Sequence, residues 1–260
     1  MRTVIPINPQ NGCAWVTGAS SGIGRAIALA LAREGWRVAV SARGAEGLES
    51  LVREASGMKG SIHPYPLDVA DARQVTDVYG AISQTNGPVA LAILNAGIYL
   101  PVETAGQIDA APFLQSMQVN YMGVVHCLVP LLPELMAHKM GHVVIVSSVT
   151  GYGGLPRAAA YGPTKAALIN LAECLKFDLD RAGVQISVVC PGFVDTPATA
   201  ANPFPMPFLM PSNLAALRIL AGIQEGSFEI TFPRRFTYAL KFINMLPYRA
   251  YFFLVKRFTG

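Results

Sequence analysis

A tyrosine and a lysine spaced four residues apart could carry out proton transfer in this chain. Tyr161 and Lys165 lie on the same face of any helix that contains both. A free phenol has a pKa near ~10 and exchanges protons poorly at neutral pH. A neighbouring ammonium favours the phenolate and lowers that pKa, so the pair could act as a general acid or base. Since exposed helical pairs share this spacing by chance, the prediction needs support from other residues.

A glycine-rich turn near the N-terminus is the second motif with chemical meaning. The apolar run 13–16 leads into Thr17-Gly18-Ala19-Ser20-Ser21-Gly22-Ile23-Gly24, and a helical pattern follows as far as Gly35. Strand, glycine turn and helix together form the context of a dinucleotide-binding fingerprint. Glycines let the backbone approach a pyrophosphate, and the helix N-terminus supplies N–H groups. The spacing T-G-x-x-x-G-x-G is more selective than a simple tight turn, which is the alternative interpretation.

The second predicted strand, residues 37–42, ends without a carboxylate. In an NAD-binding unit, an Asp or Glu at this point holds the ribose 2′-hydroxyl. Here Arg43 follows instead and offers a guanidinium to a 2′-phosphate. Ser20 and Ser21 could add hydroxyl contacts to the same phosphate. The sequence therefore favours NADP(H) as the cofactor, with NAD(H) as the alternative and an ordinary solvated Arg43 as the simpler interpretation.

Apolar runs and helical patterns alternate along the whole chain. Six runs predict strands, at residues 13–16, 37–42, 62–67, 89–94, 141–146 and 184–190. Helical patterns lie between them, one at 72–84 and the longest at about 109–138. A chain of 260 residues with 52% hydrophobic content fits one large α/β domain. We predict a Rossmann-like, doubly wound parallel sheet in a three-layer α/β/α arrangement.

Residues suited to ligand contact follow several of these strands. Open parallel sheets bind ligands beyond the carboxyl ends of their strands, and Gly18, Arg43, Asp68, Asn95 and Gly97 all fall at such ends. That shared placement is more informative than any one residue. An asparagine inside a helix is mildly unfavourable, so Asn120, near the middle of the longest helix, is either exposed or has an internal task.

Taken together, the motifs resemble the short-chain dehydrogenase/reductase family, in its subgroup of short, single-domain chains. Order and spacing agree over about residues 10–200, including the thirteen-residue step from Ser148 to Tyr161. The matching positions are Thr17-Gly18-x-x-x-Gly22-x-Gly24, Asn95-Ala96-Gly97, Asn120, Ser148, Tyr161-x-x-x-Lys165 and Pro191-Gly192. The resemblance implies an oxidoreductase that transfers hydride reversibly between a nicotinamide and a ketone or secondary alcohol.

The resemblance also implies a catalytic tetrad. Tyr161 would exchange a proton with the substrate oxygen, while Lys165 would lower the pKa of Tyr161 and hydrogen-bond the nicotinamide ribose. Ser148 would hydrogen-bond the carbonyl oxygen, where negative charge develops. Ser147 competes for this role but lacks the family spacing. Asn120 would anchor a water that links Lys165 to solvent.

Cofactor contacts are implied in the same way. Asp68 would contact the adenine, Asn95 the adenosine-side ribose, and Val194 and Thr196 the nicotinamide amide. Pro163 departs from the family pattern but is tolerable in the first turn of a helix. The complete predicted cofactor set is Gly18, Ser20, Ser21, Gly22, Ile23, Gly24, Arg43, Asp68, Asn95, Ala96, Gly97, Tyr161, Lys165, Pro191, Gly192, Val194 and Thr196.

The segment from Phe193 to Pro211 indicates the class of substrate. It carries five prolines interleaved with apolar side chains, namely Phe204, Met206, Phe208, Leu209 and Met210. In the family this region covers the substrate, so a hydrophobic ketone or alcohol is favoured. Packing against the body or a neighbouring subunit is an equal alternative. Further candidates for the pocket lining are Tyr99, Leu100, Gly153 and Leu155.

Residues 231–260 form a predicted helical extension to a domain at 1–230. The extension holds six basic residues and no acid, so it accounts for more than the formal net charge of +4 and leaves −2 on the remainder. Two helices, at 237–246 and 248–258, combine these charges with aromatic residues, which suits an interfacial helix on an anionic membrane. A hairpin packed on the body or across a subunit interface is the alternative. The Gly-rich ending typical of 3-ketoacyl-carrier-protein reductases is missing.

The remaining features limit the cellular compartment and the partners of the protein. The four cysteines and four histidines have no metal-type spacing, and three cysteines lie in apolar runs, which predicts reduced, buried cysteines in a cytoplasmic protein without a metal site. Residues 1–11 contain no run suited to a signal peptide. A small-molecule substrate is expected, and nucleic acid is not. The family habit of pairing through the helices that bear Asn120 and Tyr161 predicts a homodimer or homotetramer. A non-catalytic nucleotide sensor or membrane-associated scaffold is the alternative function, which an intact tetrad disfavours.

Overall fold

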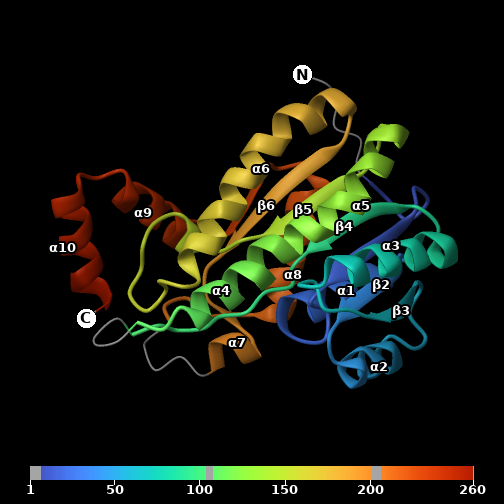
Figure 1. The fold of residues 1–260 in the computed structure, drawn as a ribbon, viewed down its shortest axis with the longest axis horizontal. Coiled ribbons are helices and arrows are strands. Elements are labelled where there is room, and N and C mark those ends of the chain that lie inside the picture. The colour runs from blue at the N-terminus through green and yellow to red at the C-terminus, as the bar shows by residue number, and fades with distance from the viewer. Residues whose placement is uncertain (1–6, 104–107, 201–205, 260) are drawn as a thin grey trace.

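A central parallel sheet lies between two layers of helices (Figure 1). The computed structural model describes residues 7–103, 108–200 and 206–259. The sheet has seven strands in the order β3-β2-β1-β4-β5-β6-β9, and a separate pair, β7 and β8, lies beyond it. The bounds are β1 Cys13–Thr17, β2 Arg37–Ala42, β3 Ser61–Pro66, β4 Val89–Leu94, β5 His142–Val146, β6 Gln185–Pro191, β7 Val194–Asp195, β8 Met210–Pro211 and β9 Glu229–Phe232. The predicted Rossmann-like α/β fold is confirmed.

Two apolar cores form on the two faces of this sheet. One is shared with α1 (Gly22–Arg33), α2 (Ala45–Glu54) and α8 (Ser212–Gln224). The other is shared with α3 (Ala72–Asn86), α5 (Gly123–His138) and α6 (Gly162–Ala182). The remaining helical elements are α4 Ala111–Met117, the π-helical turn η1 Gln118–Met122, the 3-10 turn η2 Val149–Gly151, α7 Pro197–Ala200, α9 Arg234–Asn244 and α10 Tyr248–Thr259.

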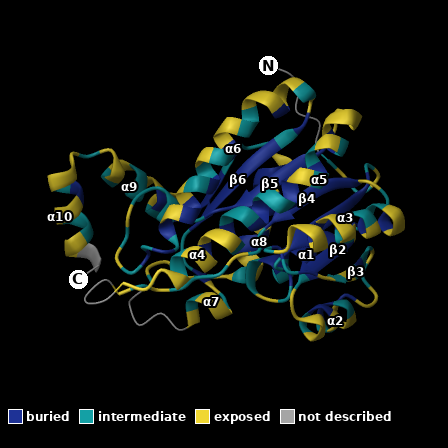
Figure 2. Cartoon of the chain, viewed as in Figure 1, coloured by how far each residue is buried: buried dark blue, intermediate teal, exposed yellow. Residues whose placement is uncertain are grey.

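The central strands are apolar along their whole length because both faces are covered. Every residue of β1, β4 and β5 is buried, as the dark sheet in Figure 2 shows. β3 begins and ends one residue earlier than predicted and contains Pro64 and Pro66. Proline removes a ladder donor, and β3 accommodates both because it is an edge strand of the sheet.

Strand β9 was absent from the predicted strands. It pairs in parallel with β6, from Val188 opposite Glu229 to Pro191 opposite Phe232. Four residues that begin with a glutamate are too few to show a strand period, so only the tertiary structure identifies them. The strand crosses the predicted boundary between residues 230 and 231. Thr231 and Phe232 therefore belong to the sheet, and the helical extension begins at Arg234.

The predicted burial of the cysteines is right for three and wrong for one. Cys13, Cys127 and Cys190 are buried, whereas Cys174 is exposed. Cys174 lies on α6, whose outward face meets solvent while Leu168 and Ala172 pack on the sheet. Among the described residues, no group of three or more His, Cys, Asp or Glu could hold a metal ion.

The longest apolar helical stretch runs from Ala111 to His138 and includes η1. By length and composition it could cross a membrane. A core helix of a globular protein passes the same test, and Leu128, Leu131 and Leu135 of this stretch pack into the core on one face of the sheet. The stretch is therefore weak support for a membrane span.

Candidate active site

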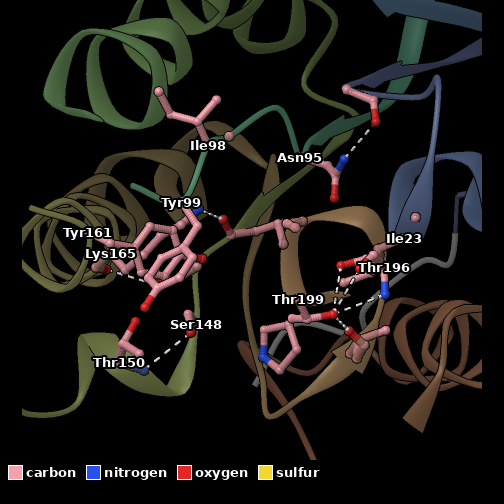
Figure 3. Close-up of a pocket in the computed structure, with 18 of the residues that line it drawn as sticks. Ile23, Asn95, Ile98, Tyr99, Ser148, Thr150, Tyr161, Lys165, Thr196 and Thr199 are labelled. Carbon is pink, nitrogen blue, oxygen red and sulfur yellow. Dashed lines mark hydrogen bonds between the residues drawn. The ribbon is translucent and has the colours of Figure 1, made fainter. Parts of the chain in front are cut away.

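A cavity of about 1200 Å³ lies beyond the carboxyl ends of the central strands. Figure 3 shows Ile23, Asn95 and Thr196 toward one side of it and Ser148, Tyr161 and Lys165 toward the other. Gly24 and Asn120 are the two predicted site residues that do not line it. Those that do are Gly18, Ser20, Ser21, Gly22, Ile23, Arg43, Asp68, Asn95, Ala96, Gly97, Ser148, Tyr161, Lys165, Pro191, Gly192, Val194 and Thr196.

The glycine loop brings backbone close to the N-terminus of α1. Ser21 occupies the N-cap position, yet its side chain makes no capping hydrogen bond, so first-turn N–H groups remain available to an anion. Gly22 has a φ of +55°, and a Cβ there would lie 2.9 Å from Cγ2 of Thr196. Gly24 lies behind the loop, where a Cβ would be 2.5 Å from the carbonyl oxygen of Gly18. Gly24 thus permits close packing rather than ligand contact.

A clamp of hydrogen bonds ties this loop to the end of β4. The hydroxyl of Thr17 accepts the backbone N–H groups of Asn95 (3.0 Å) and Ala96 (3.1 Å). In return, Nδ2 of Asn95 donates to the carbonyl oxygens of Thr17 (3.0 Å) and Gly18 (3.2 Å). We call the glycine loop, residues 17–24, together with the N-terminus of α1 the cradle. Asn95 therefore fixes the shape of the cradle, in addition to lining the cavity.

Arg43 stands at the end of β2, where the strand provides no carboxylate. Its side chain is exposed at the cavity rim, and among the described residues it forms no ion pair. Asp68, at the end of the neighbouring β3, accepts the N–H of Ala70 at 3.0 Å through its carboxylate. A guanidinium with no partner beside a cavity is available to an anionic group.

Tyr161 is half-buried in the cavity wall, immediately before α6 begins. Burial raises the pKa of Tyr161 to about 12, although a hydrogen bond with the Ser148 side chain acts in the lowering direction. The edge of the Tyr99 ring meets the Tyr161 ring, with centroids 5.2 Å apart. Burial has the largest effect on this pKa, so the predicted lowering by Lys165 stays a prediction. The phenol is protonated at neutral pH.

Lys165 lies one helical turn beyond Tyr161 and points toward β5. Its Nζ donates to the carbonyl oxygen of Val146 at 2.9 Å and lies 5.4 Å from the centroid of the Tyr161 ring. Burial lowers the pKa of Lys165 to about 8. A Cβ on Gly97 would lie 3.4 Å from this Nζ, so the small residue after β4 makes room for the ammonium.

The two neighbouring serines have different partners. The hydroxyl of Ser147 is buried and donates to the backbone carbonyl of Lys165 at 2.7 Å. The hydroxyl of Ser148 faces the cavity and accepts the N–H of Thr150 at 3.2 Å. The backbone donor occupies a lone pair of Ser148 and leaves its proton free to be donated. The Ser147 hydroxyl is therefore engaged with the backbone, whereas the Ser148 hydroxyl is directed at the cavity.

Asn120 is completely buried and occupies the π-helical turn η1. Its Oδ1 accepts the N–H of Ile98 at 2.7 Å, and its Nδ2 donates to the carbonyl of Ile98 (3.0 Å) and to the hydroxyl of Thr164 (3.1 Å). Of the two alternatives for an asparagine inside a helix, the internal task is correct. π-Turns often occur at functional sites. This one connects the loop after β4 to the helix of Tyr161.

Comparison with known proteins identifies the family. Residues 12–203 match the family model described as short chain dehydrogenase. The chain belongs to the short-chain dehydrogenase family. It is therefore an NAD(P)-dependent oxidoreductase that acts on CH–OH and C=O groups.

Relatives of this short-chain dehydrogenase support the same assignment. It is 36% identical to an uncharacterized oxidoreductase of Myxococcus xanthus, over 90% of this chain and 92% of the relative. It is 33% identical to a 3-oxoacyl-[acyl-carrier-protein] reductase of Thermotoga maritima, over 72% of this chain and 76% of the relative. A short chain dehydrogenase/reductase from Burkholderia phymatum, solved in complex with NAD, has a TM-score of 0.80 and 25% identity, over 88% of this chain and 92% of that one.

The extension contributes one part of the apolar wall of the dehydrogenase cavity. Helix α9 contributes Phe236, Ala239, Leu240 and Ile243, none of which was a predicted site residue. A repeated apolar spacing of three and four residues along this helix was the available signal. From the predicted loop, Pro197, Pro207 and Phe208 line the cavity, whereas Met206, Leu209 and Met210 do not. Residues 201–205 lie outside the described residues. Of the four further candidates, Tyr99 and Leu155 line it and Leu100 and Gly153 do not.

The two serines of this dehydrogenase can be separated by mutation. We expect Ser148→Ala to lower kcat by roughly 10²-fold or more, since it removes a donor aimed at developing negative charge. Ser147→Ala removes one buried hydrogen bond to backbone and should cost about 1 kcal/mol of unfolding free energy with kcat changed less than about fivefold. Steady-state kinetics and chemical denaturation of both variants check this. A larger kcat loss in Ser147→Ala would reverse the assignment.

Proposed function

We propose that the chain transfers hydride reversibly between NADP(H) and a hydrophobic ketone or secondary alcohol, with Tyr161 as general acid and base. The observation that carries this proposal is the meeting of Tyr161, Ser148 and Lys165 in one cavity with a glycine-loop cradle. The alternative of a non-catalytic sensor or scaffold keeps the cradle but gives no reason for a donor, a proton source and a lysine to converge.

The cradle fits a dinucleotide. The uncapped N-terminus of α1 suits a pyrophosphate, and Gly18 and Gly22 keep side chains out of its path. The nicotinamide cofactor would supply or accept the hydride. NAD bound to the Burkholderia phymatum relative supports the same position for the cofactor of this chain. Arg43 and the missing carboxylate after β2 favour a 2′-phosphate, hence NADP(H) over NAD(H).

The side chains suit proton transfer to a reduced carbonyl. As hydride reaches the carbonyl carbon, the oxygen gains negative charge and takes the phenolic proton of Tyr161, while Ser148 donates a hydrogen bond to the same oxygen. Lys165 would bind the nicotinamide ribose and stabilise negative charge on the phenol. Asn120, through its hydrogen bond to Thr164, would position the helix turn that carries Tyr161 and Lys165. Oxidation of the alcohol runs these steps in reverse.

Substrate class and assembly follow from the exposed and cavity-facing apolar side chains. Phe208, Phe236 and Ile243 give the cavity an apolar wall that suits a bulky or extended carbonyl compound. Val129 on α5 and Phe177 on α6 are exposed by 65% and 73%, which supports a homodimer or homotetramer that pairs through these helices.

A spectrophotometric assay tests the proposed reaction. The purified chain should oxidise NADPH in the presence of hydrophobic ketones and reduce NADP+ with the corresponding secondary alcohols. Nucleotide binding without turnover across a panel from short alkanones to steroid-sized ketones would favour the sensor. Size-exclusion chromatography tests the assembly. The purified chain should elute as a single species with the mass of a dimer or a tetramer.

Arg43 provides the test of cofactor preference. We expect Arg43→Ala to raise the KM for NADPH by about tenfold, the loss of one charge-assisted contact, and to leave the KM for NADH within about twofold. Arg53→Ala, at an exposed arginine of α2, is the matched control. An equal change for both cofactors would show that Arg43 does not read the 2′-phosphate.

A further inference from the structure

Helices α9 and α10 form a hairpin at one end of the molecule, beyond the edge strand β9 (Figure 1). The hairpin belongs to a segment, 231–260, that holds six basic residues and no acidic one, while the rest of the chain carries a net negative charge. Such a concentration of positive charge at one end gives the protein an electrostatic face for an anionic partner.

Helix α9 has two apolar faces. Phe236, Leu240 and Ile243 face the cavity and line it. Tyr238, Phe242 and the C-cap residue Met245 follow the same three- and four-residue spacing on another face and are exposed by 52%, 64% and 83%. A surface helix of a globular protein needs one apolar face only, so the second face is suited to an apolar environment outside the chain.

Helix α10 continues this exposed surface and adds the charges. Phe252 and Phe253 are exposed by 62% and 69%, and the ring of Tyr248 stacks on that of Phe252 at 5.9 Å. Arg249, Lys256 and Arg257 are exposed on the same helix, and Figure 2 shows exposed residues along both helices of the hairpin. Twelve residues are too few to span a bilayer, which needs about 20. Aromatic and basic side chains mixed on one short helix fit an interface of acyl chains and anionic headgroups.

Contacts tie the hairpin to the rim of the active-site cavity. Tyr251 of α10 is buried, and its hydroxyl donates to the backbone carbonyl of Gly154 at 2.5 Å, next to cavity-lining Leu155. Lys241 of α9 pairs with Glu229 of β9. The hairpin is therefore fixed beside the cavity that α9 lines, and a surface that receives the hairpin is brought near that cavity.

We propose that the α9–α10 hairpin docks on an anionic membrane and that the cavity takes its substrate, a membrane-dissolved ketone or alcohol, from that bilayer. The delivery step rests on the proposed function, whereas the docking step does not. A mixed aromatic and basic surface favours lipid over a second copy of this chain, because two copies of the hairpin would bring like charges together.

Sedimentation with vesicles tests the docking step without nucleotide or substrate. The wild type should bind phosphatidylcholine vesicles that contain phosphatidylglycerol at least about tenfold more tightly than pure phosphatidylcholine vesicles, and salt should weaken this binding. Phe242→Ser/Phe253→Ser and Lys256→Gln/Arg257→Gln should each lose about tenfold or more in binding to the anionic vesicles. Leu217→Ser, at an apolar residue of α8 that is 57% exposed, is the matched control and should bind as the wild type does.

Two results would overturn docking. One is equal binding by the wild type and both hairpin variants. The other is a wild type that does not bind anionic vesicles, together with a Phe242→Ser/Phe253→Ser variant that no longer forms the wild-type oligomer. That result would make the hairpin an interface between copies of the chain.

Kinetics test delivery separately. For a long-chain ketone dissolved in anionic vesicles, kcat/KM should fall about tenfold in the hairpin variants, in parallel with vesicle binding. For a short water-soluble ketone, kcat/KM should stay within about twofold, because the mutated side chains do not line the cavity. Equal losses for both ketones would overturn delivery. Absent turnover of every ketone by the wild type would count against the proposed function and leave the vesicle result standing.

Discussion

Replacement of Tyr161 by phenylalanine is expected to lower kcat by about 10³-fold, within the range found for loss of a general acid or base. The variant keeps the ring and its edge contact with Tyr99 but loses the proton that a nascent alkoxide would take. Because burial raises the pKa of Tyr161 to about 12, the wild-type phenol is protonated throughout the neutral range. Nucleotide affinity should stay within about twofold, since the phenol contributes little to the glycine-loop cradle.

Tyr99→Phe is the matched control for this substitution. Tyr99 lines the same cavity, and its substitution by phenylalanine removes the same hydroxyl from a neighbouring ring. Nothing in the proposed mechanism requires the hydroxyl of Tyr99. We expect kcat to change less than about fivefold. Single-turnover measurements on both variants, with fluorescence titration of NADPH, separate chemistry from binding. Comparable losses in the two variants, or an unchanged kcat in Tyr161→Phe, would remove Tyr161 from its assigned role.

The residues that belong to motifs of fixed spacing could be placed from the sequence alone. Gly18, Asn95, Ser148 and Tyr161 each follow a buried strand or begin a helix, and parallel strands bring their carboxyl ends to one edge. Local patterns were enough there because the strands are apolar throughout and the turns need glycine. Both features can be recognised from the identity of the residues.

The features that escaped prediction depend on contacts between distant segments. β9 is too short to show a period and exists through its pairing with β6. The wall formed by Phe236 and Leu240 depends on where α9 lies after β9. The pKa of Tyr161 depends on how deeply the phenol is buried, which spacing to Lys165 does not reveal. Spacing predicts which residues meet, and packing decides in what electrostatic environment.

Gly24→Ala is expected to weaken nucleotide binding by about 100-fold and to lower the free energy of unfolding by about 2 kcal/mol, as overpacking of a tight site does. The added Cβ would lie 2.5 Å from both the carbonyl oxygen of Gly18 and Nδ2 of Asn95. Neither atom can yield cheaply, because Asn95 is clamped to Thr17 and Gly18 by hydrogen bonds. The start of α1 must move away from the loop, and the N–H groups that we propose bind the phosphates move with it.

Gly80→Ala separates this effect from the ordinary influence of alanine in a helix. A Cβ at Gly80, inside α3, would meet nothing within 4 Å. Alanine is the better helix former by roughly 0.5–1 kcal/mol, so Gly80→Ala should raise stability and leave nucleotide binding unchanged. Calorimetric titration with NADPH and thermal denaturation of both variants give the two quantities. If Gly24→Ala is folded at 25 °C and binds NADPH like the wild type, the cradle does not depend on close packing between α1 and the glycine loop. If instead it is destabilised and its remaining folded fraction binds weakly, a residue that touches no ligand determines the geometry of those that do.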